Sequence, residues 1–314
     1  MTASTENEAH ARDLLALLFG EWLAGVAGTA DVTPAEPGLY LARAGDALVA
    51  LAIEPLGSGP EAWQAELQAF AARLTPPENG ALVWLPPGAA PPRDEPAQTE
   101  AVAAVQRTLE ALQPGETADA RLPIAISVRK RDEAGAYVSA FGGLAPYWAQ
   151  FTDRVRGYYQ IDSNALHRLP DDEATIKTLI DRIVAATEGM RLDELRVVEA
   201  EDYWRVQRLR SGQGVAVLGL PPGDESEQGA PLRRRVREAL SEAGQRLRQH
   251  EEAARALLLV GHYASVQNEP VGTALRGLDP ALFAGIDLVA LAADATIKPL
   301  LDITRRIARR GAPA

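Results

Sequence analysis

The spacing of apolar residues predicts alternating helices and strands in the first part of the chain. Leucines recur at three- and four-residue steps in residues 9–24, which indicates a helix with a broad buried face. Residues 38–53 read as two short strands joined at Ala44-Gly45-Asp46, whose glycine and aspartate suit a tight hairpin turn. An amphipathic helix at 60–74 and an apolar strand at 81–85 complete the order helix, hairpin, helix, strand.

A proline-rich segment at 86–96 separates this group of elements from the next. The segment has no periodic apolar face, which is typical of an exposed, stiff connector. A helix is predicted after it at 98–112. Residues 122–130 and 136–141 then alternate in the manner of strands, and the turn residues between them predict a second hairpin.

The second half of the chain repeats this outline. Its predicted elements are a helix, an extended segment, a hairpin, a helix and a strand, at 171–188, 195–198, 204–210 with 215–220, 231–251 and 256–260. We therefore predict an α/β fold with mixed sheets flanked by helices, in which two related helix-hairpin-helix-strand halves could be present. The two units would be residues 1–118 and 119–314, which could pack as one continuous body. Two further strands, at 286–291 and 296–301, and an arginine-rich amphipathic helix close the chain.

Composition narrows the classes of function. The chain has 314 residues and no cysteine, which excludes disulfides, thiolate metal sites and a cysteine nucleophile. A net charge of -11 repels nucleic acid and anionic membranes, and leaves nucleic-acid binding to local basic clusters such as Arg129-Lys130-Arg131. The N-terminus lacks the pattern of a signal peptide, and no apolar run approaches the ~20 residues of a membrane helix. We expect a soluble, cytoplasmic protein without membrane association.

The order helix, strands, helix, strand resembles the core of the restriction-endonuclease-like (PD-(D/E)XK) superfamily. In that superfamily a helix carboxylate, an aspartate on one strand and a Glu-x-Lys on the next hold magnesium and activate water. The resemblance assigns these roles to Glu21, Asp46 and Glu54, since magnesium prefers carboxylate and water ligands. The lysine is missing, because Pro55 and Leu56 follow Glu54. The resemblance therefore implies a degenerate, metal-free relative, with a nuclease dependent on Mg²⁺ or Mn²⁺ as the alternative.

Residues 151–170 form the segment richest in candidate binding side chains: Tyr158, Tyr159, Asp162, His167 and Arg168. Tyrosine can stack on a ligand, histidine can transfer a proton near neutral pH, and arginine can clamp a carboxylate or phosphate. The segment thus predicts a small-ligand pocket. It fits a structural role as well, with the tyrosines on opposite faces of a strand and Asp162 or Ser163 at a helix cap.

Other catalytic patterns are weaker. His262 follows the predicted strand at 256–260 and could be a core histidine or a functional one at a strand end. The glycines of residues 210–219 precede a strand instead of a helix, so they do not form a dinucleotide fingerprint. We predict a binding or scaffolding protein with a protein partner and no cofactor. The metal-dependent nuclease and the small-ligand protein remain the alternatives.

Overall fold

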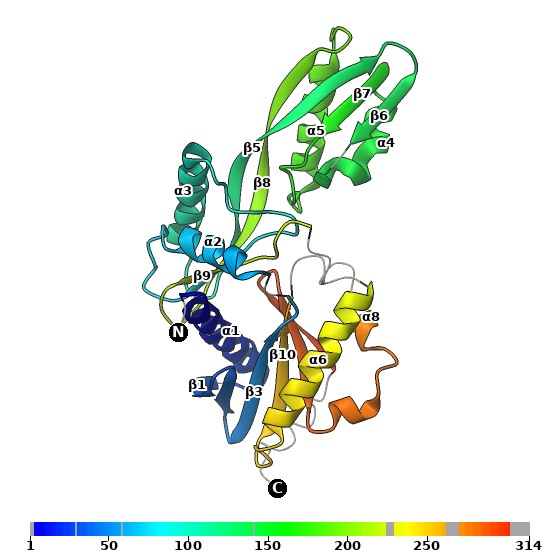
Figure 1. Cartoon of the computed structure of the whole chain (residues 1–314). Coiled ribbons are helices and arrows are strands. Elements are labelled where there is room, and N and C mark those ends of the chain that lie inside the picture. The colour runs from blue at the N-terminus through cyan, green and yellow to red at the C-terminus, as the bar shows by residue number, and fades with distance from the viewer. Residues whose placement is uncertain are drawn as a thin grey trace. The chain divides into compact units, whose positions relative to one another are not determined.

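The computed structural model describes residues 3–28, 30–57, 59–140, 142–223, 229–261 and 270–301. The predictions for His262 and for the arginine-rich terminal helix lie outside these residues. Two mixed sheets of six strands each are flanked by helices (Figure 1), which confirms the predicted α/β class. Among the described residues, no helix combines the length and the apolar character needed to cross a membrane.

The chain divides into two compact units, each described by itself below. Unit 1 comprises Met1–Pro91, Gln106–Ala118 and Arg205–Ala314, and unit 2 comprises Pro92–Val105 and Asp119–Trp204. The sequence grouped residues 205–314 with 119–204, whereas the structure joins them to the N-terminal residues. The cause is strand pairing over a long separation in sequence, because a C-terminal strand lies parallel to a strand of the first hairpin.

The sheet that lies wholly in unit 1 has the order β1-β2-β3-β10-β11-β12. Its strands are β1 (Ala30–Glu36), β2 (Leu39–Ala44), β3 (Ala47–Pro55), β10 (Ala254–Val260), β11 (Leu288–Ala293) and β12 (Thr296–Leu301). β1, β2 and β3 form an antiparallel meander, which confirms the hairpin predicted at 38–53. β3, β10 and β11 are parallel, and β12 returns antiparallel to β11.

Helices cover both faces of this sheet. α1 (Ala3–Ala27) buries Phe19 in a core cluster with Leu51 and Leu258, whereas α6 (Gly229–Leu247) buries Leu240 with Leu257 in a second cluster. Neighbouring residues of β10 thus point into different cores, as successive side chains of a strand do. The helix α2 (Glu61–Ala71), α8 (Pro270–Leu275) and the short 3₁₀ helix η2 (Pro280–Phe283) complete the helices described in this unit.

The second sheet has the order β6-β7-β5-β8-β4-β9. Its strands are β4 (Ala81–Trp84), β5 (Thr117–Asp132), β6 (Ala136–Ala140), β7 (Gly157–Asp162), β8 (Leu195–Arg208) and β9 (Val215–Leu218). Two predicted hairpins are wrong, because β7 lies between β5 and β6, and β4 lies between β8 and β9. The alternation of side chains identified the strands, but it carries no information about which strands pair. The second half of the chain therefore does not repeat the hairpin of the first.

In unit 2 the core lies on one face of the strands. α5 (Glu173–Thr187) and α4 (Trp148–Thr152) contribute Ile180 and Phe151 to the same buried cluster as Val128, Ile161 and Val198 of the sheet. Figure 1 shows both helices beside β7 and β6. The other helices among the described residues are the 3₁₀ helix η1 (Gly142–Tyr147) and α3 (Glu95–Ala111), whose residues are divided between the two units. Asp172 caps the N-terminus of α5, because its carboxylate accepts hydrogen bonds from the backbone N–H groups of Ala174 and Thr175.

Candidate functional site

The carboxylates that the resemblance assigned to a metal are separated in unit 1. Asp46 lies in the turn before β3 and Glu54 lies near the end of that strand. An extended strand rises about 3.3 Å per residue, so the two positions are about 26 Å apart. A magnesium ion with ligands at about 2.1 Å cannot bind both. Within the described residues, no three histidine, cysteine or acidic residues are grouped so that they could hold a metal ion.

Two of these carboxylates have partners within the protein. Glu54 forms an ion pair with Arg246 of α6, which also donates a hydrogen bond to the carbonyl of Pro37 at 3.4 Å. Glu21 of α1 accepts a hydrogen bond from the backbone N–H of Arg210. Burial raises the pKa of Glu21, and the contact with Arg210 opposes that rise. These interactions connect secondary-structure elements of unit 1 and account for both side chains without a metal.

A small cavity lies at the carboxyl ends of β3 and β10, which is where ligands bind in many parallel sheets. Its walls include Leu15, Ile53, Gly219 and Val260, with Arg12 at its margin. The cavity measures about 60 Å³. Ligand sites commonly enclose about 300–1,000 Å³, so this space suits a few water molecules better than a cofactor or substrate.

Tyr158 and Tyr159 of unit 2 lie on opposite faces of β7. Tyr159 is 3% exposed and belongs to the core cluster, whereas Tyr158 and Asp162 belong to the alternate, less buried positions. The Tyr159 hydroxyl donates to the carbonyl of Thr187 at 3.3 Å. Asp162 accepts a hydrogen bond from the backbone N–H of Asn164 at 3.2 Å, as a turn residue does. These side chains therefore do not line one pocket.

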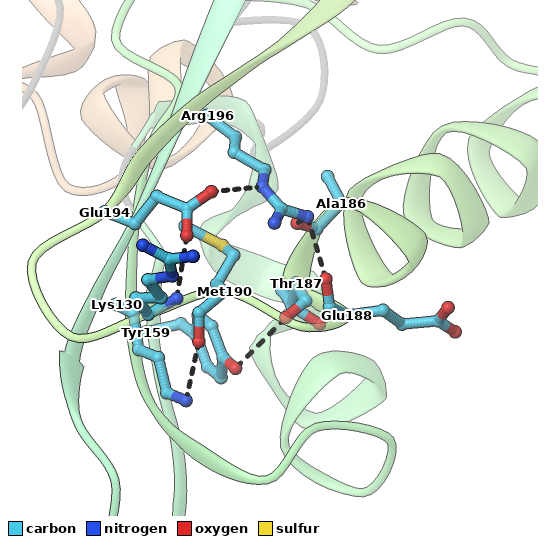
Figure 2. A network of polar contacts seen from close by, with 9 residues as sticks. Lys130, Tyr159, Ala186, Thr187, Glu188, Met190, Glu194 and Arg196 are labelled. Atoms are coloured by element: carbon cyan, nitrogen blue, oxygen red, sulfur yellow. Dashed lines mark hydrogen bonds and ion pairs between the residues drawn. The ribbon is translucent and has the colours of Figure 1, made fainter.

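Tyr159 borders a polar network that closes the end of α5 (Figure 2). The Lys130 ammonium lies 5.9 Å from the centroid of the Tyr159 ring and donates to the carbonyl of Met190 at 2.9 Å. Arg196 donates to the carbonyls of Ala186 and Glu188 at 2.9 and 2.8 Å, beyond the reach of the helix's own donors. The network anchors the connection between α5 and β8.

His167 and Arg168 share a hydrogen-bonding partner, Asp202, which the sequence patterns did not single out. Asp202 is 3% exposed. One of its oxygens accepts hydrogen bonds from the backbone N–H groups of His167 and Arg168, at 2.9 and 2.8 Å. The other lies 2.9 Å from Nδ1 of the His167 ring. A carboxylate in this position orients an imidazole and selects its tautomer.

The Arg168 side chain is directed into the protein instead of toward solvent. The Arg168 side chain is buried, and its Nη1 lies 4.0 Å from a carboxylate oxygen of Asp119. A guanidinium held in this way is not a surface clamp for a carboxylate or phosphate. The His167–Asp202 pair joins the segment after β7 to β8, and it therefore supports the structural reading of residues 151–170 more directly than the pocket.

The strands of unit 2 have a second face, opposite the core, which we call the outer face. It carries a different set of side chains. Register places Arg129 of β5 beside Gln160 of β7. Arg131 donates two hydrogen bonds to the Gln160 side chain, at 3.0 and 2.9 Å. On β8, Leu195 is 50% and Val197 62% exposed. The outer face comprises Arg129, Tyr158, Gln160, Asp162, Leu195, Val197, Glu199 and Glu201.

Sequence reasoning singled out Tyr158, Asp162 and the basic cluster that contains Arg129, but not the outer-face residues of β8. Leu195 and Val197 alternate with more buried residues on β8, a period-2 pattern visible in the sequence. Their exposure could not be read from that pattern, because it does not say which face is covered. Comparison with family models, with curated proteins and with solved structures found no match, so the site is interpreted from its own geometry.

Proposed function

We propose that the protein is a non-catalytic binding protein whose recognition surface is the outer face of unit 2. The observation that carries the proposal is the exposure of Leu195 and Val197 on a sheet whose other face holds the core. Exposed apolar residues bordered by polar ones mark interaction surfaces in many proteins. Polar residues lie on the same face, Arg129 on the adjacent strand β5 and Gln160 on β7 beyond it.

Unit 1 would serve as the scaffold, with a degenerate nuclease-like core. The resemblance was based on the helix at 9–24, the hairpin at 38–53, the helix at 60–74 and the strand at 81–85. In the structure the last of these, β4, belongs to the second sheet, but α1, the meander β1-β2-β3, α6 and β10 follow the same helix, strands, helix, strand order in unit 1. The separation of Asp46 from Glu54 and the pairing of Glu54 with Arg246 favour a core without catalytic metal. Metal binding is the property that would contradict this part of the proposal.

Recognition is tested by a matched pair of variants. Leu195→Ser with Val197→Ser removes the apolar part of the outer face, and Val26→Ser removes an equally exposed apolar residue, 53% exposed, from the end of α1. Each protein is used as bait in an extract of the source cells, and retained proteins are quantified by mass spectrometry. The double variant should lose partners that the native protein and Val26→Ser both retain. Full retention by a folded double variant would exclude the outer face as the recognition surface.

The metal-dependent nuclease alternative is tested separately by thermal denaturation with Mn²⁺ and Mg²⁺. A ligand at a hundred times its dissociation constant stabilises a protein by about 2.7 kcal/mol, which is readily visible as a higher melting temperature. We expect no rise in the native protein or in Asp46→Ala, whose side chain lies at an exposed turn. A manganese-dependent rise that Asp46→Ala abolishes would reinstate the nuclease alternative.

A further inference from the structure

The strand β8 has a free edge within unit 2. The order of the sheet gives β8 two neighbours, β5 and β4. β4 is short and pairs with β8 only from Arg205 to Arg208. Within the part of the chain that the structure describes, residues 195–201 of β8 therefore have a neighbouring strand on one side only. An edge of this kind offers unpaired backbone N–H and C=O groups to another chain.

Hydrogen bonds at the end of β8 show which residues face this edge. Arg208 donates its N–H to the carbonyl of Glu116, directly before β5, and accepts from the N–H of Gly115, whereas the next residue, Leu209, donates to the carbonyl of Gly80, directly before β4. Even-numbered residues thus direct their backbone groups toward β5, because backbone groups alternate sides along a strand. The odd-numbered residues direct theirs toward the free edge, and these are Leu195, Val197, Glu199 and Glu201.

Residues 195–201 lack two of the residue types that usually block strand addition. Natural edge strands are protected by proline, lysine, bulges or a covering segment. Residues 195–201 contain no proline and no lysine, and their one basic residue, Arg196, is bound to the end of α5. Leu195, Val197 and Glu199 are exposed. Three of the odd-numbered residues along this edge are therefore accessible to a partner.

We propose that the edge of β8 binds an extended basic segment of a partner protein, which adds to the sheet as a further strand. The inference rests on the proposed function and specifies its partner. Along the edge, two apolar residues precede Glu199 and Glu201. A strand lying beside them places apolar residues opposite Leu195 and Val197 and lysine or arginine opposite the glutamates, as favourable cross-strand pairs require.

Charge and side-chain pairing favour a basic protein segment over a nucleic-acid strand and over a second copy of the chain. The net charge of -11 attracts a basic segment and repels a nucleic-acid strand. A second copy of the chain fits poorly, because antiparallel self-pairing over residues 195–201 sets Leu195 against Glu201 and Val197 against Glu199. Tyr203 donates a hydrogen bond to Glu201 at 2.9 Å, which holds that carboxylate in place at the end of the stretch.

The test uses the full chain and fluorescently labelled synthetic peptides in an anisotropy titration. One ten-residue peptide alternates valine with lysine, a second alternates valine with glutamate, and a third repeats the first with N-methylated backbone groups. A ten-nucleotide RNA tests for nucleic-acid binding. Sedimentation of the protein alone tests for self-association. The proposal requires that the protein bind the lysine peptide at least about tenfold more tightly than the other probes, a difference of about 1.4 kcal/mol.

Two variants of β8 then distinguish the contribution of backbone hydrogen bonds to peptide binding from that of the glutamate charges. Val197→Pro removes an N–H that faces the edge and should weaken binding at least about tenfold, because a ladder hydrogen bond is lost. Glu199→Lys with Glu201→Lys should lose the lysine peptide and gain the glutamate peptide. Glu251→Lys with Glu252→Lys, exposed residues of unit 1, changes net charge equally and should leave the preference unchanged.

Equal affinity for the acidic and basic peptides, or for the N-methylated one, would overturn the proposal. So would an unaltered preference in the Glu199→Lys, Glu201→Lys protein, which stays informative even if Val197→Pro fails to fold. Preferential RNA binding would assign the outer face to nucleic acid, and a dimer that Val197→Pro abolishes would assign the edge to a second copy. If the serine variants lose natural partners but no peptide binds, the proposed function stands and this inference fails.

Discussion

The two units differ in how their sheets are covered. In unit 1, α1 and α6 bury opposite faces of the sheet, and its central strands β3 and β10 are almost continuously apolar. In unit 2 the core occupies one face, and the strands alternate between buried and more exposed residues. Parallel strands covered on both sides suit a rigid scaffold, whereas an antiparallel sheet can leave one face for recognition.

This contrast predicts very different costs for removing apolar side chains from the two units. Phe19→Ala in α1 should reduce the free energy of unfolding by about 3–5 kcal/mol, because it empties a fully buried site. Val197→Ala on the outer face should change it by no more than about 0.5 kcal/mol. Urea denaturation measures both values. A large loss for Val197→Ala would mean that this residue packs against the protein, and the two-unit contrast would be wrong.

Asp202→Ala should have the next largest effect. The change leaves the backbone N–H groups of His167 and Arg168 without their acceptor, at about 1–3 kcal/mol for each buried group. Hydrogen exchange should show lost protection in the segment after β7 and little change in unit 1. Asp202→Asn keeps one acceptor oxygen and should recover part of the loss. Equal stability of native and Asp202→Ala proteins would show that this pair does not hold the segment.

The burial of Glu21 in unit 1 can be tested through the pH dependence of stability. Burial raises the pKa of its carboxyl above 4.5, so the folded protein binds the proton more tightly than the unfolded chain. This contribution to stability is present below pH 4.5 and is lost as pH rises through the raised pKa. Glu21→Gln should therefore gain stability relative to the native protein as pH rises from 4 to 7 in urea titrations. The opposite trend would indicate that the hydrogen bond from Arg210 outweighs burial.

Asp172 should contribute the smallest change in stability, with a pH dependence opposite in sign to that of Glu21. Hydrogen bonds from the Thr175 hydroxyl and from the N–H groups of Thr175 and Ala174 lower the pKa of this exposed helix cap below 3.8. Its contribution is present above pH 3.8 and is lost as pH falls through the lowered pKa. The stability difference between native and Asp172→Ala proteins should therefore shrink in acid. A difference independent of pH between 7 and 2 would exclude the charged cap.

The site residues show where sequence reasoning stops. The alternation in 157–162 correctly implied that Tyr158 and Tyr159 occupy different faces, and that pattern alone argues against a pocket lined by both. Asp202 could have been noticed as an acid at a position in phase with buried Val198 and Ala200. Its partners could not, because His167 and Arg168 lie more than thirty residues away and no local rule connects them.

The sequence by itself determined the elements of this protein. Helix and strand periods, turn residues and prolines located α2, α5 and β3 to within a few residues, because these signals act between near neighbours in the chain. Only the tertiary structure decided that β10 pairs with β3, that β7 separates β5 from β6, and that β4 pairs with β8 only from Arg205 to Arg208. Strand pairing depends on contacts between distant residues whose apolar faces are interchangeable, so alternation alone cannot select among them.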